Sequence, residues 1–161
     1  TFTGILVAAR AGSAMAAEIG SMSVSEQIDA LRALAVNPVR YLVVPRMVAA
    51  MVMLPLLTVI AEVFGALGAY WVSLQSGVSS QQFIHSATVF LTERDFVGGL
   101  LKTVVFGFII VIVGCRQGLR TKGGAVGVGK ATTSTVVLSI VLILVFGYFM
   151  SAIIVGPINQ R

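Results

Sequence analysis

The fold of this chain is decided by the stretch SVSEQIDALRALAVNP, residues 23–38. Ser23 and Glu26 have the spacing of a capping box, in which the hydroxyl accepts a hydrogen bond from a free backbone amide and the carboxylate reaches back to the first residue. Asn37 followed by Pro38 is typical of a helix end. We therefore predict a short helix over about residues 23–36.

This predicted helix is amphipathic. Its apolar face comprises Val24, Ile28, Leu31 and Leu34 or Ala35. Its polar face comprises Ser25, Glu26, Asp29 and Arg32. At about 1.5 Å per residue the helix is roughly 18 Å long, too short for a hydrocarbon core of about 30 Å. We expect it at the membrane surface, where it either docks a partner or lies in the headgroups, and the pattern alone leaves both open.

The composition places the chain among membrane proteins. Hydrophobic residues make up 57% and charged residues 11%, with a mean hydropathy of +1.00, which is far from soluble globular values. The net charge of +5 would suit nucleic acid, but the basic residues lie between apolar runs rather than along one folded face, so we expect no nucleic-acid partner. We find no signal peptide, and the chain opens inside an apolar stretch, so we expect that an N-terminal part is missing.

Four apolar segments are predicted to enter the membrane. We interpret residues 1–20 as the cytoplasmic half of a span, and residues 47–73, 96–115 and 136–156 as three full spans. The loops at 32–46 and 116–130 are basic, whereas the segment 76–95 is nearly neutral and has a weak helical pattern. The positive-inside rule therefore places both basic loops in the cytoplasm.

Small residues recur every four positions in two of these segments, a spacing that lets helix backbones approach closely in lipid. The first set is Ala8, Gly12, Ala16 and Gly20. The second set is Ala61, Gly65, Ala69 and Ser73. We expect both faces to pack against neighbouring helices, and Pro55 to kink or loosen its helix.

Four charged residues interrupt the apolar segments and are candidate intramembrane or cavity charges. Arg10 and Glu18 lie on roughly one face and either snorkel, pair or contact a substrate. Glu62 lies inside a span, where an ionised side chain needs a partner, a proton or water. Lys102 lies within about one helical turn of the same depth, so a Glu62–Lys102 pair is possible if their helices are neighbours; otherwise each lines a watery or lipid-filled cavity.

Other motifs indicate no catalysis, metal or cofactor in this chain. The run GAVGVGKA, residues 124–131, nearly matches a phosphate-binding loop, but Ala131 lacks the hydroxyl that would bind magnesium and no strand precedes the glycines. We instead expect this run to open a spanning helix, with Thr132, Thr133 and Ser134 available as caps. Cys115 and His85, the single residues of their kinds, do not make a disulfide or a metal site.

Several motifs in a fixed order resemble the MlaE/YrbE permease family over nearly the whole chain. They are ARAGSA (9–14), AEIG (17–20), SEQIDAL (25–31), NP (37–38), VPR (44–46), LPLLT (54–58), KTVVFG (102–107), GGA (123–125) and GVGKATT (127–133).

The resemblance implies an all-α, polytopic integral membrane bundle that is the permease of an ABC transporter for phospholipids or related lipids, moved between inner and outer membranes. It implies location in the bacterial inner membrane, a second copy of the permease, a separate ABC ATPase subunit that hydrolyses the ATP, and an MCE-domain protein on the periplasmic side. The short amphipathic helix would be the coupling helix that docks on the ATPase. Its docking residues would be Ser25, Glu26, Gln27, Asp29, Leu31, Arg32 and Leu34.

By the same resemblance, residues 1–161 form one transmembrane permease domain, the C-terminal portion of a longer family domain that begins within the second of five spans. Glu18 and Lys102 fall on charged positions of the family pattern. The chain departs from the family at Tyr148-Phe149, where relatives often carry an aspartate before the phenylalanine, so the resemblance implies no role for an acid at this position. Two hypotheses from other classes are an ion-coupled secondary transporter that uses Glu62 or Glu18, and a membrane scaffold without transport.

Overall fold

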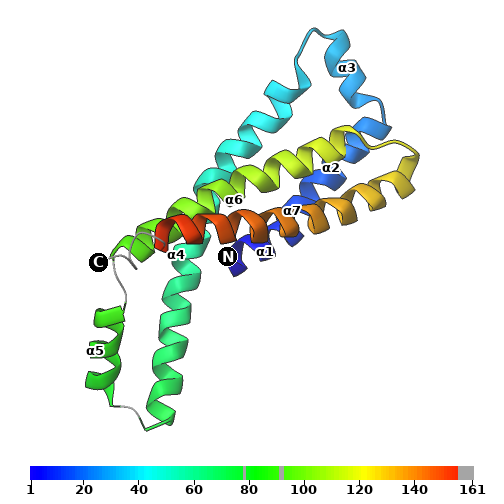
Figure 1. Cartoon of the computed structure of the whole chain (residues 1–161). Coiled ribbons are helices and arrows are strands. Elements are labelled where there is room, and N and C mark those ends of the chain that lie inside the picture. Colours follow the sequence, from blue (N-terminus) through cyan, green and yellow to red (C-terminus); the bar gives the residue numbers. More distant parts are fainter. Residues whose placement is uncertain (78, 91–92, 156–161) are drawn as a thin grey trace.

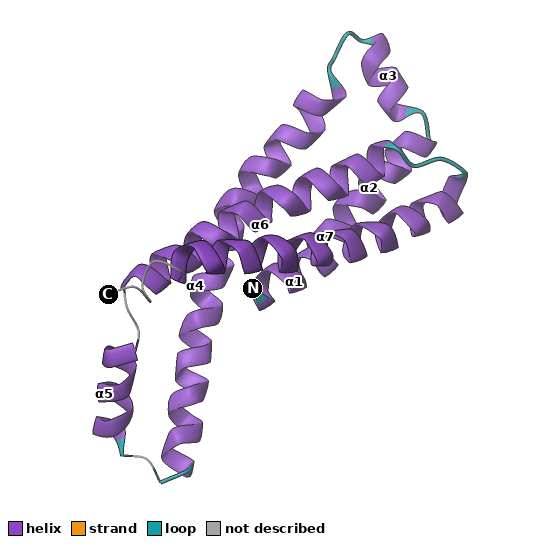
Figure 2. Ribbon diagram, in the orientation of Figure 1, coloured by secondary structure: helices purple, strands orange, loops and turns teal. Residues whose placement is uncertain are grey.

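The computed structural model describes residues 1–77, 79–90 and 93–155, and the part so described is helical, without a strand (Figure 2). The elements are α1 (Phe2–Val7), η1 (Ala8–Gly12), α2 (Ser13–Val24), α3 (Gln27–Ala33), η2 (Val39–Val43), α4 (Val44–Gln75), α5 (Ser80–Phe90), α6 (Glu93–Leu119) and α7 (Gly124–Val155). The segments η1 and η2 are single π-helical turns that continue into α2 and α4. The predicted all-α, polytopic class is confirmed.

Four helices are long and apolar enough to cross a membrane: Phe2–Val24, Val39–Gln75, Phe96–Leu119 and Gly124–Ile153. They correspond to the four predicted segments but extend beyond them. The first has 23 residues, more than the half span expected, and the last begins at Gly124 because the glycine-rich run is already helical. The predicted end of that last span, Gly156, lies outside the described residues.

The packed part of the molecule is built from α1, α2, α6 and α7, which lie side by side, with α4 crossing α6 (Figure 1). One core cluster surrounds Phe106 and Ile143, and a second lies nearer α3 and surrounds Ile19 and Cys115. Small residues let the helices approach: a Cβ atom added at Gly12 would lie 3.2 Å from a side-chain carbon of Ile110, and one added at Gly20 would lie 3.0 Å from the Thr121 hydroxyl. The small-residue face of residues 8–20 therefore packs as predicted.

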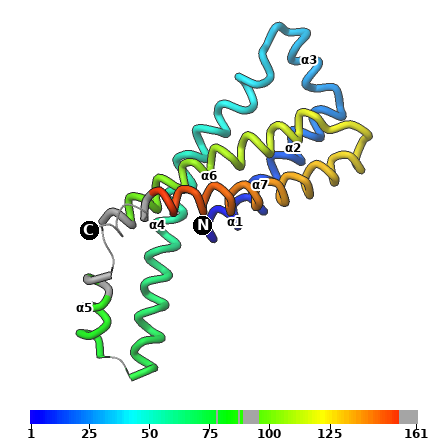
Figure 3. Tube along the Cα trace, in the orientation of Figure 1, coloured from blue at the N-terminus to red at the C-terminus, as the bar shows by residue number. Residues whose placement is uncertain are grey.

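The far half of α4 leaves this packed part and carries α5 beside it (Figure 3). Figure 1 shows α4 changing direction along its length, consistent with the missing amide at Pro55, which stands inside the helix. Tyr70 joins the two helices, since its hydroxyl is 3.1 Å from Oγ of Ser80 and its ring meets Phe83 edge-on at 5.5 Å. Within the described residues no atom lies within 4 Å of a Cβ placed at Gly65, so the second small-residue face has no partner there within this chain and its packing stays a prediction for the assembled protein.

The short helix is shorter than predicted, because its start and end signals work differently. Ser23 still belongs to α2, and its hydroxyl donates a hydrogen bond of 3.3 Å to the Thr121 carbonyl rather than capping a helix. The backbone of Glu26 has a left-handed conformation, with φ of 59°, and its side chain makes no capping hydrogen bond. The predicted capping box is therefore wrong, and α3 begins at Gln27.

The end of α3 is a Schellman motif centred on Ala35, which has φ of 57°. The Val36 amide donates to the Leu31 carbonyl and the Ala35 amide to the Arg32 carbonyl, each at 3.0 Å. Asn37 instead starts the next helix, since its Oδ1 accepts a hydrogen bond of 3.0 Å from the Val39 amide. The caps expected at Thr132 and Thr133 are also wrong, because both hydroxyls donate back to the Gly129 carbonyl inside α7.

Candidate functional site

The α3 loop, defined here as residues 25–38, lies at one end of the molecule together with the turn between α6 and α7 (Figure 1). The hydrogen bond from Ser23 to Thr121 joins the two connections at their base. The two basic loops predicted from the sequence are therefore on the same end of the molecule, opposite the connection between α4 and α5.

A single residue of α3, Ile28, is buried, and it attaches the helix to the rest of the molecule. Its side chain is 4% exposed and belongs to the core cluster that contains Ile19 of α2, Val43 of η2 and Cys115 of α6. Any displacement of α3 therefore acts first on this cluster, at the point where three other elements meet. Ile28 was placed on the apolar face by its spacing, but sequence reasoning did not include it among the site residues.

The predicted docking residues lie mostly on the surface. Leu31 is half-buried, and the other six are exposed: Ser25, Glu26, Gln27, Asp29, Arg32 and Leu34. Asp29 and Arg32 form an ion pair of 2.7 Å within the helix, and because both are well exposed it contributes little to stability. The Ser25 hydroxyl donates to the Ser21 carbonyl at 2.9 Å, at the C-terminal end of α2.

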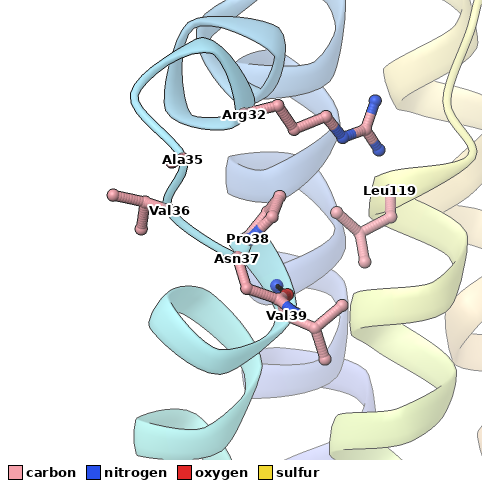
Figure 4. Close-up of a pocket in the computed structure, with 7 residues that line it drawn as sticks. All are labelled: Arg32, Ala35, Val36, Asn37, Pro38, Val39 and Leu119. Carbon is pink, nitrogen blue, oxygen red and sulfur yellow. Dashed lines mark hydrogen bonds between the residues drawn. The ribbon is translucent and has the colours of Figure 1, made fainter.

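Beside α3 an open groove of about 460 Å³ separates the loop from the end of α6. It is lined by Arg32, Ala35, Val36, Asn37, Pro38, Val39 and Leu119. Figure 4 shows Arg32 extending from α3 toward α6, where Leu119 points into the same space. A second groove of about 300 Å³ shares Leu119 and adds Arg116 and Arg120. The surface behind α3 thus combines an apolar floor with guanidinium groups.

Glu18, a candidate intramembrane or cavity charge, lies in an ion pair, which is one of the environments that the sequence left open for it. Its Oε2 is 2.8 Å from Nη2 of Arg46, which lies in the first turn of α4. Sequence reasoning left Arg46 out of the candidate set and treated it as part of a basic loop. The signal that could have found it is a charge at the start of a long apolar run, which needs a partner.

Lys102 and Glu62 do not form a direct pair, although the sequence allowed one. Nζ of Lys102 donates a hydrogen bond of 2.8 Å to Oγ of Ser151 on α7. Glu62 lies on α4 with one oxygen 3.8 Å from a Cβ position at Gly99, and within the described residues no ion pair joins it to Lys102. Arg10 lies in η1, is exposed, and lines a shallow hollow beside Thr132.

The described residues contain no cluster of three or more side chains suited to hold a metal ion. The α3 loop can act mechanically and electrostatically. It presents exposed polar side chains to a partner, and it is connected to the helix bundle through Ile28.

Comparisons with known proteins match this chain to transporter permeases. The model of the family described as Permease MlaE matches residues 1–153. A probable ABC transporter permease protein from Rickettsia typhi is 43% identical over 152 residues, covering 94% of this chain and 59% of the relative. One from Synechocystis is 44% identical, covering 92% and 57%. The chloroplastic protein TRIGALACTOSYLDIACYLGLYCEROL 1 of Arabidopsis thaliana is 43% identical, covering 93% and 43%. The chain thus spans somewhat more than half the length of its bacterial relatives.

Proposed function

The chain belongs to the MlaE permease family, and from that premise we propose that it forms part of the membrane-spanning subunit of an ABC transporter that moves phospholipids or related lipids between the inner and outer membranes of a bacterium. A separate ATPase subunit docks on α3 and hydrolyses the ATP. The observation that carries the proposal is the arrangement of α3, a short helix between two spanning helices that is exposed except at the buried Ile28 and the half-buried Leu31.

The coupling follows from the burial pattern. When the ATPase subunits close on ATP, they push α3, and the push reaches the helices through Ile28 and its neighbours Val43 and Ile19. The close-packed faces of α2 and α6 then change between two arrangements that differ in affinity for lipid, as any transport cycle of this kind requires.

A lipid as the transported substance is supported by the name of the Arabidopsis relative, which refers to a galactose-containing diacylglycerol lipid. A second copy of the permease is supported by the far half of α4, whose apolar side chains, such as Phe64 and Leu67, are largely exposed. An MCE-domain protein on the periplasmic side completes the proposed assembly, as the family resemblance implies.

Charge reversal on α3 tests the docking. In the full-length permease that contains this segment, Glu26→Lys or Asp29→Lys is expected to lower the amount of co-purifying ATPase several-fold, because each places an opposite charge on the exposed face that meets the partner. Gln75→Lys, at the exposed far end of α4, is the matched control and leaves association unchanged. Unchanged co-purification in both α3 variants would refute the docking.

Vanadate-sensitive ATP hydrolysis by the purified complex separates this proposal from ion-coupled transport. Transport that is driven by an ion gradient without an ATPase would favour ion-coupled transport, with Glu62 or Glu18 as the proton or ion site. A scaffold without transport would leave the distribution of lipid unchanged when the α3 surface is altered.

A further inference from the structure

The ion pair between Glu18 and Arg46 bridges α2 and α4, whose side chains also meet in the core cluster around Ile19 and Cys115. Glu18 lies on α2 and Arg46 on α4, with 2.8 Å between the charged atoms. The backbones of α2 and α4 make no contact along their described lengths, since each packs on α6 instead. Among the described residues this is also the one ion pair between different helices, because that of Asp29 and Arg32 lies within α3.

The pair stands at the base of the α3 loop. The chain enters the loop from α2 and leaves it into η2 and α4, so the two charged residues join the two arms that hold α3. Each arm is fixed separately: α2 by close contact of Ile19 and Gly118, and α4 by close contact of Gly107 with the Ala50 carbonyl, 3.1 Å from the Cβ position. Beside the apolar cluster that contains Ile19 and Val43, the side chains of Glu18 and Arg46 form the one ion pair between the two arms among the described residues.

The two partners of the ion pair differ in burial. The Arg46 side chain is 20% exposed, whereas that of Glu18 is 64% exposed. The guanidinium also lies beside the thiol of Cys115 on α6, and its Nη1 is buried without a hydrogen-bond partner among the described residues. Because the guanidinium is mostly buried, a movement that separates it from Glu18 leaves it without its acidic partner.

We propose that Glu18 and Arg46 are positioning residues for coupling. The pair keeps α2 and α4 at a fixed separation, so that displacement of α3 by the ATPase moves the helix bundle instead of spreading the two arms. This inference rests on the proposed function, and it makes no claim that either residue contacts the ATPase or the lipid.

The test uses the full-length permease with its ATPase, reconstituted in vesicles of phosphatidylethanolamine and phosphatidylglycerol, with a fluorescent phosphatidylethanolamine as the transported probe. Glu18→Gln and Arg46→Gln are each expected to lower the amount of lipid transported per ATP hydrolysed several-fold, while ATPase co-purification is unchanged. Because the two residues act as a unit, the double variant is expected to be no worse than the more severe single variant. Arg40→Gln removes an exposed guanidinium of η2 and is the matched control.

An unchanged ratio in both single variants, or effects that add in the double variant, would overturn the proposal. A second measurement does not depend on transport: spin labels at Ala14→Cys and Val48→Cys, both exposed positions on α2 and α4, should show a broader distance distribution in Glu18→Gln. An unchanged distribution would also overturn it. If the wild-type protein neither binds an ATPase nor transports lipid, the proposed function fails, while the spin-label distances still decide whether the pair fixes the two arms.

Discussion

Two small-residue faces with the same spacing have different environments in this molecule. On the face of residues 8–20, Gly12 and Gly20 lie against Ile110 and Thr121, with 3.2 Å and 3.0 Å from their Cβ positions to the nearest side-chain atoms. On the face of residues 61–73, Gly65 has no described neighbour within 4 Å. The difference teaches that the spacing indicates the capacity of a helix for close approach and does not say which surface approaches it.

The contrast continues in the larger side chains. Phe106 on α6 is fully buried and lies between Gly4 and Gly147, whereas Phe64 on the far half of α4 is 70% exposed. The far half of α4 therefore has an apolar surface, which lipid or another subunit covers. Three matched pairs of substitutions measure this difference in the free energy of unfolding, determined by titrating the full-length permease with SDS in mixed micelles.

The largest effect is expected for Phe106→Ala, compared with Phe64→Ala. Removing the buried ring leaves a cavity between α1, α6 and α7, and the loss should be about 3 kcal/mol. This value is at the low end of the range for such changes. The separated helices of an unfolded membrane protein stay in an apolar medium, so the loss of stability comes from the lost packing contacts and not from exposure to water. Phe64→Ala should change stability by less than about 0.5 kcal/mol. Equal losses in both variants would mean that the two regions are packed alike.

A smaller effect is expected for Gly118→Val, compared with Gly65→Val. Any Cβ at Gly118 falls 2.8 Å from Ile19 and 3.1 Å from the Ala16 carbonyl, so α2 and α6 must separate, at a cost of about 2 kcal/mol. Gly65→Val makes the same change of residue without a described neighbour. If it proved as damaging as Gly118→Val, the α4 face would have to be covered in the assembled protein, and the comparison would hold only for the isolated chain.

The smallest effect is expected for Ser151→Ala, compared with Ser73→Ala. The Ser151 hydroxyl accepts a hydrogen bond from Lys102 on another helix at 2.8 Å, and such bonds between membrane helices are worth about 0.6 kcal/mol. The Ser73 hydroxyl donates to the Ala69 carbonyl of its own helix, so its loss should leave helix association unaffected. A loss for Ser73→Ala that matched or exceeded the loss for Ser151→Ala would contradict this distinction.

The spanning helices were predictable because length and hydropathy set them directly: an apolar run long enough to cross lipid must satisfy its own backbone, and a helix does so. The ends of the short helix were not predictable, because they depend on residues far away in the chain. Ser23 has the right spacing for a cap, but its hydroxyl is drawn to the Thr121 carbonyl, 98 residues away in the sequence. Likewise Ala35 closes α3 in a conformation that usually calls for glycine.

The exposed polar residues of the α3 loop were predictable from its pattern, whereas the connections behind it were not. Which acid would pair with Arg46 depends on the crossing of α4 over α6, and no periodicity in one helix reports that crossing. The same reason explains Lys102, whose depth matches Glu62 but whose hydrogen bond goes to Ser151 on α7. Depth along each helix can be read from a sequence, but the rotation of neighbouring helices about their axes cannot.

The π-helical turn η2, Val39–Val43, connects the α3 loop to the first turn of α4. A π-turn holds one residue more than an α-turn. Deleting a single residue there would convert it to an ordinary turn and leave Arg46 and everything beyond it facing as before. The same deletion a few residues later would rotate the rest of α4 by about 100°. This short segment is therefore the place where the chain length between the α3 loop and α4 can change without turning α4 away from its partners.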